Sequence, residues 1–276
     1  MQQTTVKKPE AKSSGSARLI TAAVVLPFLI ASILLPWLKW LFVAMAITAM
    51  SLALFEFYVL AKQRGLQPDT GAGFLAAIAI LVISVFPADL YNVLFVLLVV
   101  MALTAGTLVA ATLRGAPFDK MLGSAGATIL GVLYIAMLGS HLVSLRMWDR
   151  EALAADLLSF FFLVLMGADA GAYYLGRALG KHKLAPSISP GKTWEGVVGG
   201  VAAAMVMAAV AHYWFFRELP LKYALPLAVV MTVVGIFGDL TESALKRGAG
   251  AKDAANILPG HGGLLDRLDS LLFNAP

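Results

Sequence analysis

The chain has 276 residues, of which 60% are hydrophobic and only 13% are charged, and its formal net charge is +5. A soluble domain carries about 25% charged residues, and the mean hydropathy of +0.84 is equally far from that class. These values exclude an ordinary soluble protein and predict an integral membrane protein. The sequence contains no cysteine, which excludes a disulfide framework and a thiolate site.

Long apolar runs follow one another along the chain, and most come near the roughly 20 residues that a helix needs to cross about 30 Å of hydrocarbon. The runs are continuous rather than alternating, which favours helices over strands. We therefore expect an all-α fold, a polytopic membrane bundle of about eight or nine transmembrane helices. The expected spans are Leu19–Leu35, Trp37–Leu60, Gly71–Phe86, Leu90–Leu113, Met121–Leu145, Leu153–Leu175, Gly196–Phe216 and Tyr223–Leu240.

The segments around the first spans carry further signals. Residues 1–17 are polar and basic and contain a Ser/Gly run, so we expect a disordered tail. No cleavage site of a secretory signal follows the first apolar run, so we expect the first span to be retained. The first two spans are separated by Pro36 and its neighbours, which predicts a tight helical hairpin. The span Gly71–Phe86 is short for a membrane crossing.

Lysine and arginine accumulate in cytoplasmic loops, so their placement predicts orientation. With a cytoplasmic N-terminus, 16 of the 21 basic residues fall on the cytoplasmic side. The five expected on the other side are Lys39, Arg146, Arg150, Arg217 and Lys222. This bias supports the eight spans, and it accounts for the net positive charge without a nucleic-acid partner.

Ionisable groups at membrane depth are costly and are usually functional or paired. Asp169 interrupts the apolar run GADAGAYYLGR (Gly167–Arg177), in which Gly167 and Gly171 would let another helix approach closely. A functional role is one interpretation. The alternative is that Asp169 caps a helix break or pairs with a lysine.

The stretch SISPGKTWEG (Ser187–Gly196) places Lys192 in a Pro/Gly turn directly before a span. Backbone amides of such a turn and of a helix N-terminus can bind an anion. The stretch therefore resembles a phosphate cradle, although it lacks the spacing of a P-loop. The alternative is that Thr193 merely caps the following helix.

The stretch GDLTESALKR (Gly238–Arg247) places Asp239, Glu242 and Lys246 at i, i+3 and i+7, which is one face of a helix. Glu242 and Lys246 could simply form a surface ion pair. That alternative leaves Asp239 unexplained, because Asp239 directly follows an apolar run.

The stretch LPGHGGLLDRLD (Leu258–Asp269) predicts a tight turn around His261 and then a short amphipathic helix. Asp266 and Asp269 fall at i and i+3 of that helix, so both carboxylates face the same way. Oxygen ligands of this kind suit Mg²⁺, which retains waters that substrate phosphates can replace. The alternative is a solvated helix end.

The four histidines show no paired spacing, so a zinc site is not expected.

Carboxylates for Mg²⁺ and cations for phosphate, gathered on the cytoplasmic side of a membrane bundle, indicate that the substrate is a nucleotide, a phospholipid, or both. The segment Ser243–Asp269 resembles the signature of the bacterial phosphatidate cytidylyltransferases, also called CDP-diacylglycerol synthases. That pattern runs S-x-hydrophobic-K-R, four residues, K-D-x-small, two residues, hydrophobic-P-x-H-G-G-hydrophobic-x-D-R-hydrophobic-D, and every fixed position is matched. The stretches SPGKTWEG and DAGAYYLGR also resemble cytoplasmic motifs of that family.

The resemblance implies that CTP and phosphatidic acid react to give CDP-diacylglycerol and pyrophosphate, with Mg²⁺ required. It implies that residues 18–276 are a single transmembrane catalytic domain in the bacterial inner membrane, with a cytoplasmic active site. A homodimer is expected from family analogy alone. A second cation, monovalent or divalent, is left open.

Roles follow from the resemblance and from the chemistry of the side chains. The expected metal ligands are Asp239, Asp266, Glu242 and Asp269. The residues expected to take part in catalysis are Asp239, Asp266, Lys192, Lys246 and Arg247. The expected substrate contacts are Ser189, Thr193, Lys252, His261, Arg267 and Asp169.

Two other functions compete with this interpretation. In an ion-coupled transporter, Asp169 and Asp239 would lie on an ion pathway, but the charges cluster at one membrane face rather than along a path. A CTP-dependent lipid kinase would use similar residues.

For a cytidylyltransferase the sequence also predicts a polar chamber that opens sideways between spans, because the lipid must arrive from the membrane.

Overall fold

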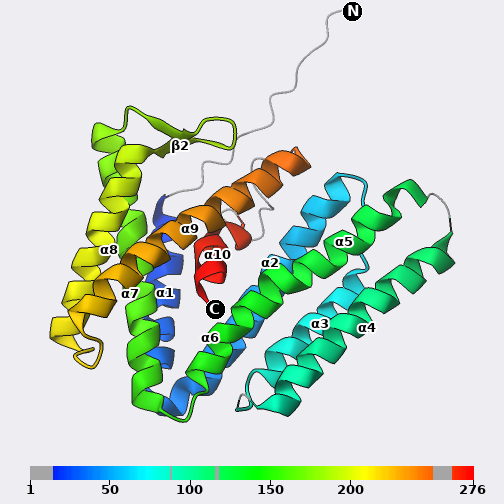
Figure 1. Cartoon of the computed structure of the whole chain (residues 1–276), viewed down its shortest axis with the longest axis horizontal. Coiled ribbons are helices and arrows are strands. Elements are labelled where there is room, and N and C mark those ends of the chain that lie inside the picture. Colours follow the sequence, from blue (N-terminus) through cyan, green and yellow to red (C-terminus); the bar gives the residue numbers. More distant parts are fainter. Residues whose placement is uncertain (1–14, 88, 116–117, 251–262) are drawn as a thin grey trace, which may run out of the picture.

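The computed structural model describes residues 15–87, 89–115, 118–250 and 263–276, and there the chain forms a helical bundle with a two-stranded sheet (Figure 1). The helices are α1 (Gly15–Leu34), α2 (Lys39–Gln63), α3 (Thr70–Ile83), α4 (Leu90–Arg114), α5 (Met121–Gly131), α6 (Leu138–Arg146), α7 (Glu151–Leu179), α8 (Trp194–Trp214), α9 (Leu221–Ala249) and α10 (Leu265–Asn274). The remaining elements are the 3₁₀ turns η1 (Pro36–Leu38) and η2 (Phe118–Lys120), the π-helical segment η3 (Val132–Met137), and the strands β1 (Lys183–Ala185) and β2 (Ser189–Thr193). The predicted helical membrane bundle is confirmed.

Within these residues, six helical segments are long and apolar enough to cross a membrane: Pro36–Gln63, Leu90–Arg114, Phe118–Arg146, Glu151–Leu179, Trp194–Trp214 and Leu221–Ala249. Two shorter apolar helices cover Ala23–Leu34 and Thr70–Ile83. Each of these segments overlaps one expected span. The expected span Tyr223–Leu240 ended too early, because α9 continues to Ala249. Apolar composition ends where the charged residues begin, but i,i+4 pairs of opposite charge allow the helix to continue.

Two local features departed from the sequence-based expectation. The stretch before α8, expected to be a loop, forms an antiparallel hairpin in which Lys183 pairs with Thr193 and Ala185 with Ser189. The hairpin carries no alternating apolar pattern, so periodicity could not indicate it. The expected span Met121–Leu145 is a continuous helical segment, but six of its residues, Val132–Met137, are π-helical.

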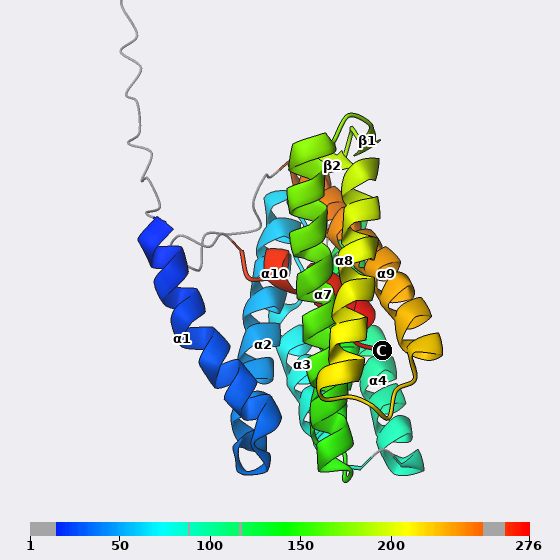
Figure 2. The ribbon, with the colours of Figure 1, turned by 90° about the vertical axis from the view of Figure 1, so that its left-hand side faces the viewer.

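The helices form two groups that meet at α10. α7, α8 and α9 pack together, while α2 packs with α3, α5, η3 and α6 (Figure 1). α10 lies between α9 and α2, and it contacts both. α1 leans away from the bundle at its beginning (Figure 2), although it contacts α2 as the predicted hairpin requires.

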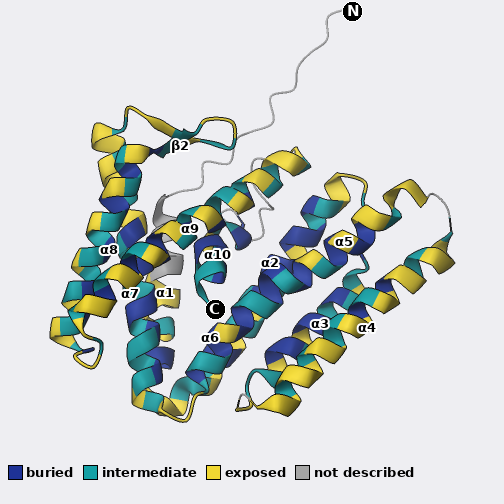
Figure 3. Cartoon of the chain, viewed as in Figure 1, coloured by how far each residue is buried: buried dark blue, intermediate teal, exposed yellow. Residues whose placement is uncertain are grey.

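The outer faces of the bundle are apolar, as a membrane protein requires. α4 is largely exposed along its length (Figure 3), and only 11% of its most apolar stretch is buried inside the protein. Leu94, Leu98 and Met101 are among its exposed side chains. Because a surface of this size and composition would be unfavourable in water, it indicates contact with lipid.

Small residues allow α7 and α8 to pack closely. A methyl group added at Gly171 would lie 2.5 Å from the carbonyl oxygen of Gly199 on α8. The predicted close approach at Gly171 is therefore confirmed. Gly200 and Ala204, two further small residues of α8, are also buried within this chain, so they serve helix packing here.

One end of the bundle is tied by polar contacts far from the hairpin. Lys39 Nζ lies 3.2 Å from Glu151 Oε1, which joins the beginnings of α2 and α7. Arg146, at the end of α6, is buried and donates to the carbonyl oxygens of Ser32 and Leu35 at 2.9 and 3.1 Å. Lys39 and Arg146 are two of the residues expected outside, and they lie at the same end of the bundle.

Candidate active site

A cavity of about 580 Å³ lies between α7, the hairpin, α8, α9 and α10. Seven residues predicted to form the site line it: Asp169, Lys192, Thr193, Asp239, Asp266, Arg267 and Asp269. Lys246 and Glu242 connect to this set through contacts with Asp266. Lys252 and His261 lie outside the described residues.

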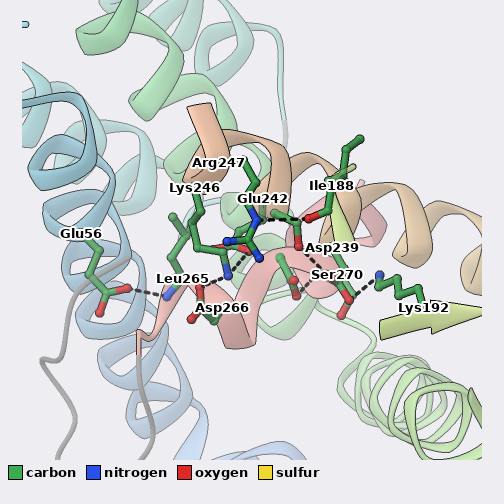
Figure 4. A network of polar contacts seen from close by, with 12 residues as sticks. Glu56, Ile188, Lys192, Asp239, Glu242, Lys246, Arg247, Leu265, Asp266 and Ser270 are labelled. Atoms are coloured by element: carbon green, nitrogen blue, oxygen red, sulfur yellow. Dashed lines mark hydrogen bonds and ion pairs between the residues drawn. The ribbon is translucent and has the colours of Figure 1, made fainter. Parts of the chain in front are cut away.

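Lys192 joins the hairpin to α9. Its Nζ lies 2.5 Å from Asp239 Oδ2, and Ser243 Oγ donates to Asp239 Oδ1 at 3.3 Å (Figure 4). The loop lysine and the helix carboxylate were predicted from stretches about 45 residues apart, and the structure places them in direct contact. The Asp239 side chain remains 40% exposed to the cavity, so it is accessible to a ligand.

Lys246 bridges two carboxylates. Its Nζ lies 2.7 Å from Glu242 Oε2 within α9 and 2.9 Å from Asp266 Oδ1 on α10 (Figure 4). The Glu242 side chain is only 1% exposed, so the alternative of a surface ion pair is wrong. Glu242 Oε1 is buried without a hydrogen-bond partner among the described residues.

α10 presents two further carboxylates to the cavity, as the i,i+3 spacing predicted. Burial and, after it, the charge of Asp239 raise the pKa of Asp269 to about 7, although the backbone N–H of Ser270, which donates at 2.6 Å, opposes the rise. Burial also opposes ionisation of Asp266, but the neighbouring side chains of Glu242 and Lys246 outweigh this effect and lower the pKa of Asp266. The two carboxyl groups of one helix therefore have opposite pKa shifts.

α9 and α10 lie very close together at this point. A methyl group added at Gly238 would lie 2.6 Å from the backbone carbonyl oxygen of Asp269. The absence of a side chain at Gly238 thus allows Asp239 and Asp269 to line the same cavity.

The donor atoms suit a hard cation, because the carboxylates that line the cavity offer oxygen ligands. Asp239 and Asp169 both act on Asp269 through their charge, which shows that these carboxylates share one local field. As they stand, no three acidic or histidine side chains of the described residues are close enough to hold one metal ion. Instead, Asp239 forms an ion pair with Lys192, and Asp266 forms one with Lys246. The residues fit Mg²⁺ in chemical type, because their donor atoms are carboxylate oxygens.

Two predicted residues have local structural contacts. Thr193 Oγ1 accepts from Gly196 N at 3.1 Å, so it caps α8, as the alternative proposed. Arg247 Nε donates to Ile188 O at 3.3 Å, which ties α9 to the turn of the hairpin. Ser189 opens β2 and does not line this cavity. Asp169 lies within the continuous helix α7, so it does not cap a helix break.

Two residues at or near the site were missed. Arg177 lines the cavity and donates to Tyr173 Oη at 3.0 Å. It belongs to the stretch that was singled out for Asp169, so a basic residue two helical turns further on was an available signal. Glu56 was also missed, although a lone carboxylate in an apolar span is itself a signal.

Comparison with known proteins decides the family. The sequence model of the cytidylyltransferase family matches residues 16–276. The chain belongs to the cytidylyltransferase family. A relative from Pseudomonas aeruginosa is 37% identical over 266 residues, which cover 94% of this chain and 93% of that protein. The resemblance stated from the signature is thus confirmed.

Relatives with higher identity match over shorter stretches. One from Bacillus subtilis is 42% identical over 159 residues, which span 58% of this chain and 57% of that protein. One from Haemophilus influenzae is 45% identical over 124 residues, or 44% of this chain and 43% of that protein. All three relatives are named phosphatidate cytidylyltransferase.

The cytidylyltransferase signature maps onto the two elements that carry the carboxylates. Its beginning, Ser243–Gly250, lies at the C-terminal end of α9, and its last residues, from Gly263 to Asp269, lead into α10. The part between them, residues 251–262, lies outside the described residues.

Proposed function

We propose that this protein is a phosphatidate cytidylyltransferase, which converts CTP and phosphatidic acid to CDP-diacylglycerol and pyrophosphate. The observation that carries the proposal is the cavity in which carboxylates of α7, α9 and α10 meet the basic residues Lys192, Arg177 and Arg267. A site for two phosphate compounds needs both kinds of charge. The names of the relatives support the same reaction.

The nucleophile is the phosphate of the lipid itself. A phosphate monoester has a second pKa near 6, so it is largely dianionic at neutral pH and needs no strong general base. Its oxygen attacks the α-phosphorus of CTP, the bond to the β-phosphate oxygen breaks, and pyrophosphate leaves. The barrier is mainly the repulsion between two polyanions, which cations and in-line positioning reduce.

Asp239 and Asp266 are the proposed ligands of Mg²⁺, with Asp269 and Glu242 as supporting or further ligands. Bound Mg²⁺ would neutralise phosphate charge and polarise phosphate oxygens. The proposal leaves open whether a second cation, monovalent or divalent, also binds.

Lys192 and Lys246 hold the carboxylates in place before substrates arrive. Their ammonium groups carry rotatable donors, so they can turn from carboxylate oxygens to phosphate oxygens. Lys252 and His261 remain predicted substrate contacts on the strength of the signature alone.

CTP arrives from water and the lipid from the membrane, so the hairpin end of the bundle is proposed to face the bacterial cytoplasm. The excess of Lys and Arg in the segments assigned to that side supports this orientation in the inner membrane. A homodimer is a further proposal from family analogy. Mass measurement in nanodiscs that found only monomers would count against it.

The test follows the α-phosphate of CTP. Purified protein is incubated with α-labelled CTP, phosphatidic acid and Mg²⁺, and the label is expected in the organic phase as a liponucleotide, with pyrophosphate in equal amount. A kinase would leave the α-label in water-soluble CDP, and a transporter would leave CTP intact. EDTA should stop the transfer and added Mg²⁺ should restore it. Label that stays in water with folded protein would reject the assignment.

A further inference from the structure

Glu56 is a carboxylate about two turns before the C-terminal end of the apolar helix α2, and it is completely buried. Its Oε1 accepts from Leu264 N at 2.8 Å, and its Oε2 accepts from Leu265 N at 2.7 Å. Figure 4 shows the carboxylate pointing at the beginning of α10. Both oxygens are therefore engaged by backbone groups that lie more than 200 residues away in sequence.

The beginning of α10 depends on this contact. The first N–H groups of any helix have no partner within the helix, and a side chain just before the helix usually accepts from them. The N-cap residue of α10 is Leu264, which has no side-chain acceptor. Glu56 supplies the missing acceptor from α2, and its negative charge is favourable at the positive end of the helix dipole.

α10 carries two carboxylates of the site. Asp266 directly follows Leu265, and Asp269 lies one turn later; both line the cavity. α10 is held on its other side by the close approach at Gly238 and by the ion pair from Lys246. A shift or rotation at the beginning of α10 would thus move Asp266 away from Lys246.

We propose that Glu56 is a positioning residue for the transfer reaction: it anchors the N-terminus of α10 so that Asp266 and Asp269 face the cavity. Glu56 does not line the cavity, so it acts through α10 rather than on a substrate. The inference rests on the proposed function of that cavity. It also gives α2, which belongs to the other group of helices, a direct part in forming the site.

The informative substitution is Glu56→Gln, which keeps the shape but replaces one acceptor by a donor that faces a backbone N–H. Arg146→Gln is the matched control, because Arg146 is also fully buried and also bonds two backbone groups, but at the other end of the bundle. Glu56→Asp keeps the charge on a side chain one methylene shorter, so it tests rescue.

Two measurements separate positioning from general stability. The first is hydrogen–deuterium exchange of the α10 peptide in substrate-free protein, compared with a peptide from α8. The second is kcat together with the Mg²⁺ concentration that gives half-maximal activity. For Glu56→Gln we expect α10 to exchange about 10-fold faster with α8 unchanged, kcat to fall about 10- to 100-fold, and more Mg²⁺ to be needed.

Glu56→Asp should recover part of kcat and part of the α10 protection. Arg146→Gln should lower the thermal unfolding midpoint but leave the Mg²⁺ requirement and the α10 exchange of the folded protein unchanged. Wild-type α10 exchange and kcat in Glu56→Gln would overturn the proposal. The proposal would also be overturned if Glu56→Gln, like Arg146→Gln, lowered the thermal unfolding midpoint but left the Mg²⁺ requirement and the α10 exchange unchanged.

If Glu56→Gln does not fold, Glu56→Asp decides: a wild-type Mg²⁺ requirement with wild-type α10 exchange would overturn the proposal. The exchange measurement needs no turnover. A wild-type protein without label transfer would therefore reject the proposed reaction, whereas unchanged α10 exchange would reject only the role of Glu56.

Discussion

Lysine–carboxylate contacts are the main electrostatic feature around the cavity. Lys192 contacts Asp239, and Lys246 contacts both Asp266 and Glu242. A partly buried carboxylate is stable in its charged form when a cation lies close by. The same contacts keep the ammonium groups near the position where substrate phosphates are proposed to bind. At Asp266 the pair with Lys246 thus preserves both kinds of charge, because the contact with Lys246 helps to lower the pKa of that carboxyl group.

Asp239→Asn and Asp266→Asn are expected to lower kcat by about 100-fold or more, because each removes a proposed metal ligand and the charge that holds a lysine. The measurement is label transfer in detergent at saturating Mg²⁺. Asp89→Asn is the matched control: Asp89 caps α4 by accepting from Asn92 N at 2.8 Å, and asparagine caps equally well. Near-wild-type turnover in either site variant, with folding shown by thermal unfolding, would contradict the metal assignment.

Lys192→Ala is expected to weaken CTP binding about 10-fold or more, because a charged hydrogen bond to phosphate is lost and Asp239 is left unpaired. Lys192→Arg should not restore it, since a planar guanidinium places its charge differently from an ammonium. Calorimetric titration with CTP is the measurement. Lys222→Ala, a change at a lysine that lies over the Tyr223 ring at the beginning of α9, serves as control. Equal CTP affinity in Lys192→Ala and in the control would remove Lys192 from the site.

Local spacing predicted part of the site and could not predict the rest. Asp266 and Asp269 were identified because i,i+3 spacing places two side chains on one face of a helix. The capping role of Thr193 followed equally from its place before α8. The bond from Glu56 to α10 could not be predicted, because it depends on how two distant helices pack. The burial of Glu242 escaped prediction for the same reason.

The contact between α9 and α10 shows how an element positions a site. α9 carries Asp239 and Glu242, α10 carries Asp266 and Asp269, and the two helices lie too close together at Gly238 to leave room for a side chain. The hairpin adds Lys192 from the other side, and Arg247 of α9 ties the hairpin turn through Ile188 O. Three elements thus bring opposite charges together across one cavity.

Gly238→Ala is expected to lower the stability by about 1–3 kcal/mol and to reduce kcat, because the added methyl meets a backbone atom of α10 and the helices must separate. Gly248→Ala, also in α9, is the matched control, since a methyl there would meet no atom of the described residues within 4 Å. Gly248 is the last but one residue of α9, so alanine there should leave the control equal to wild type or more stable by at most about 1 kcal/mol. Thermal unfolding and turnover are measured for both. A Gly238→Ala variant with wild-type midpoint and kcat would contradict the close packing.

Hydropathy predicted the helices well, because crossing a membrane requires long apolar segments with satisfied backbone groups. It could not predict the β1–β2 hairpin, whose strands are too short and too polar to show a period. It also ended the last span at Leu240, where charged residues begin, although α9 continues as a helix. Lys192 lies in the hairpin, and Glu242 and Lys246 lie in the last turns of α9, where a functional requirement overrides the apolar pattern.

The arrangement of the whole molecule places opposite properties at its two ends. The hairpin, the cavity and their charges lie at one end, while Lys39, Glu151 and Arg146 tie helices together at the other. Many large apolar side chains are exposed on the surface between the two ends, which indicates contact with lipid. Such an arrangement suits an enzyme that takes one substrate from water on one side of the membrane and the other from the bilayer.

Labelling of single cysteines tests which end faces the cytoplasm, and the absence of native cysteine removes any background. Lys181→Cys introduces a thiol at an exposed position beside the hairpin, and Arg217→Cys introduces one at an exposed position between α8 and α9. A membrane-impermeant maleimide should label Arg217→Cys in intact spheroplasts and Lys181→Cys only in inverted vesicles, because basic loops are retained in the cytoplasm. Detergent should expose both thiols equally and so controls for reactivity. Labelling of Lys181→Cys from outside intact spheroplasts would reverse the proposed orientation, and CTP made in the cytoplasm could then not reach the cavity.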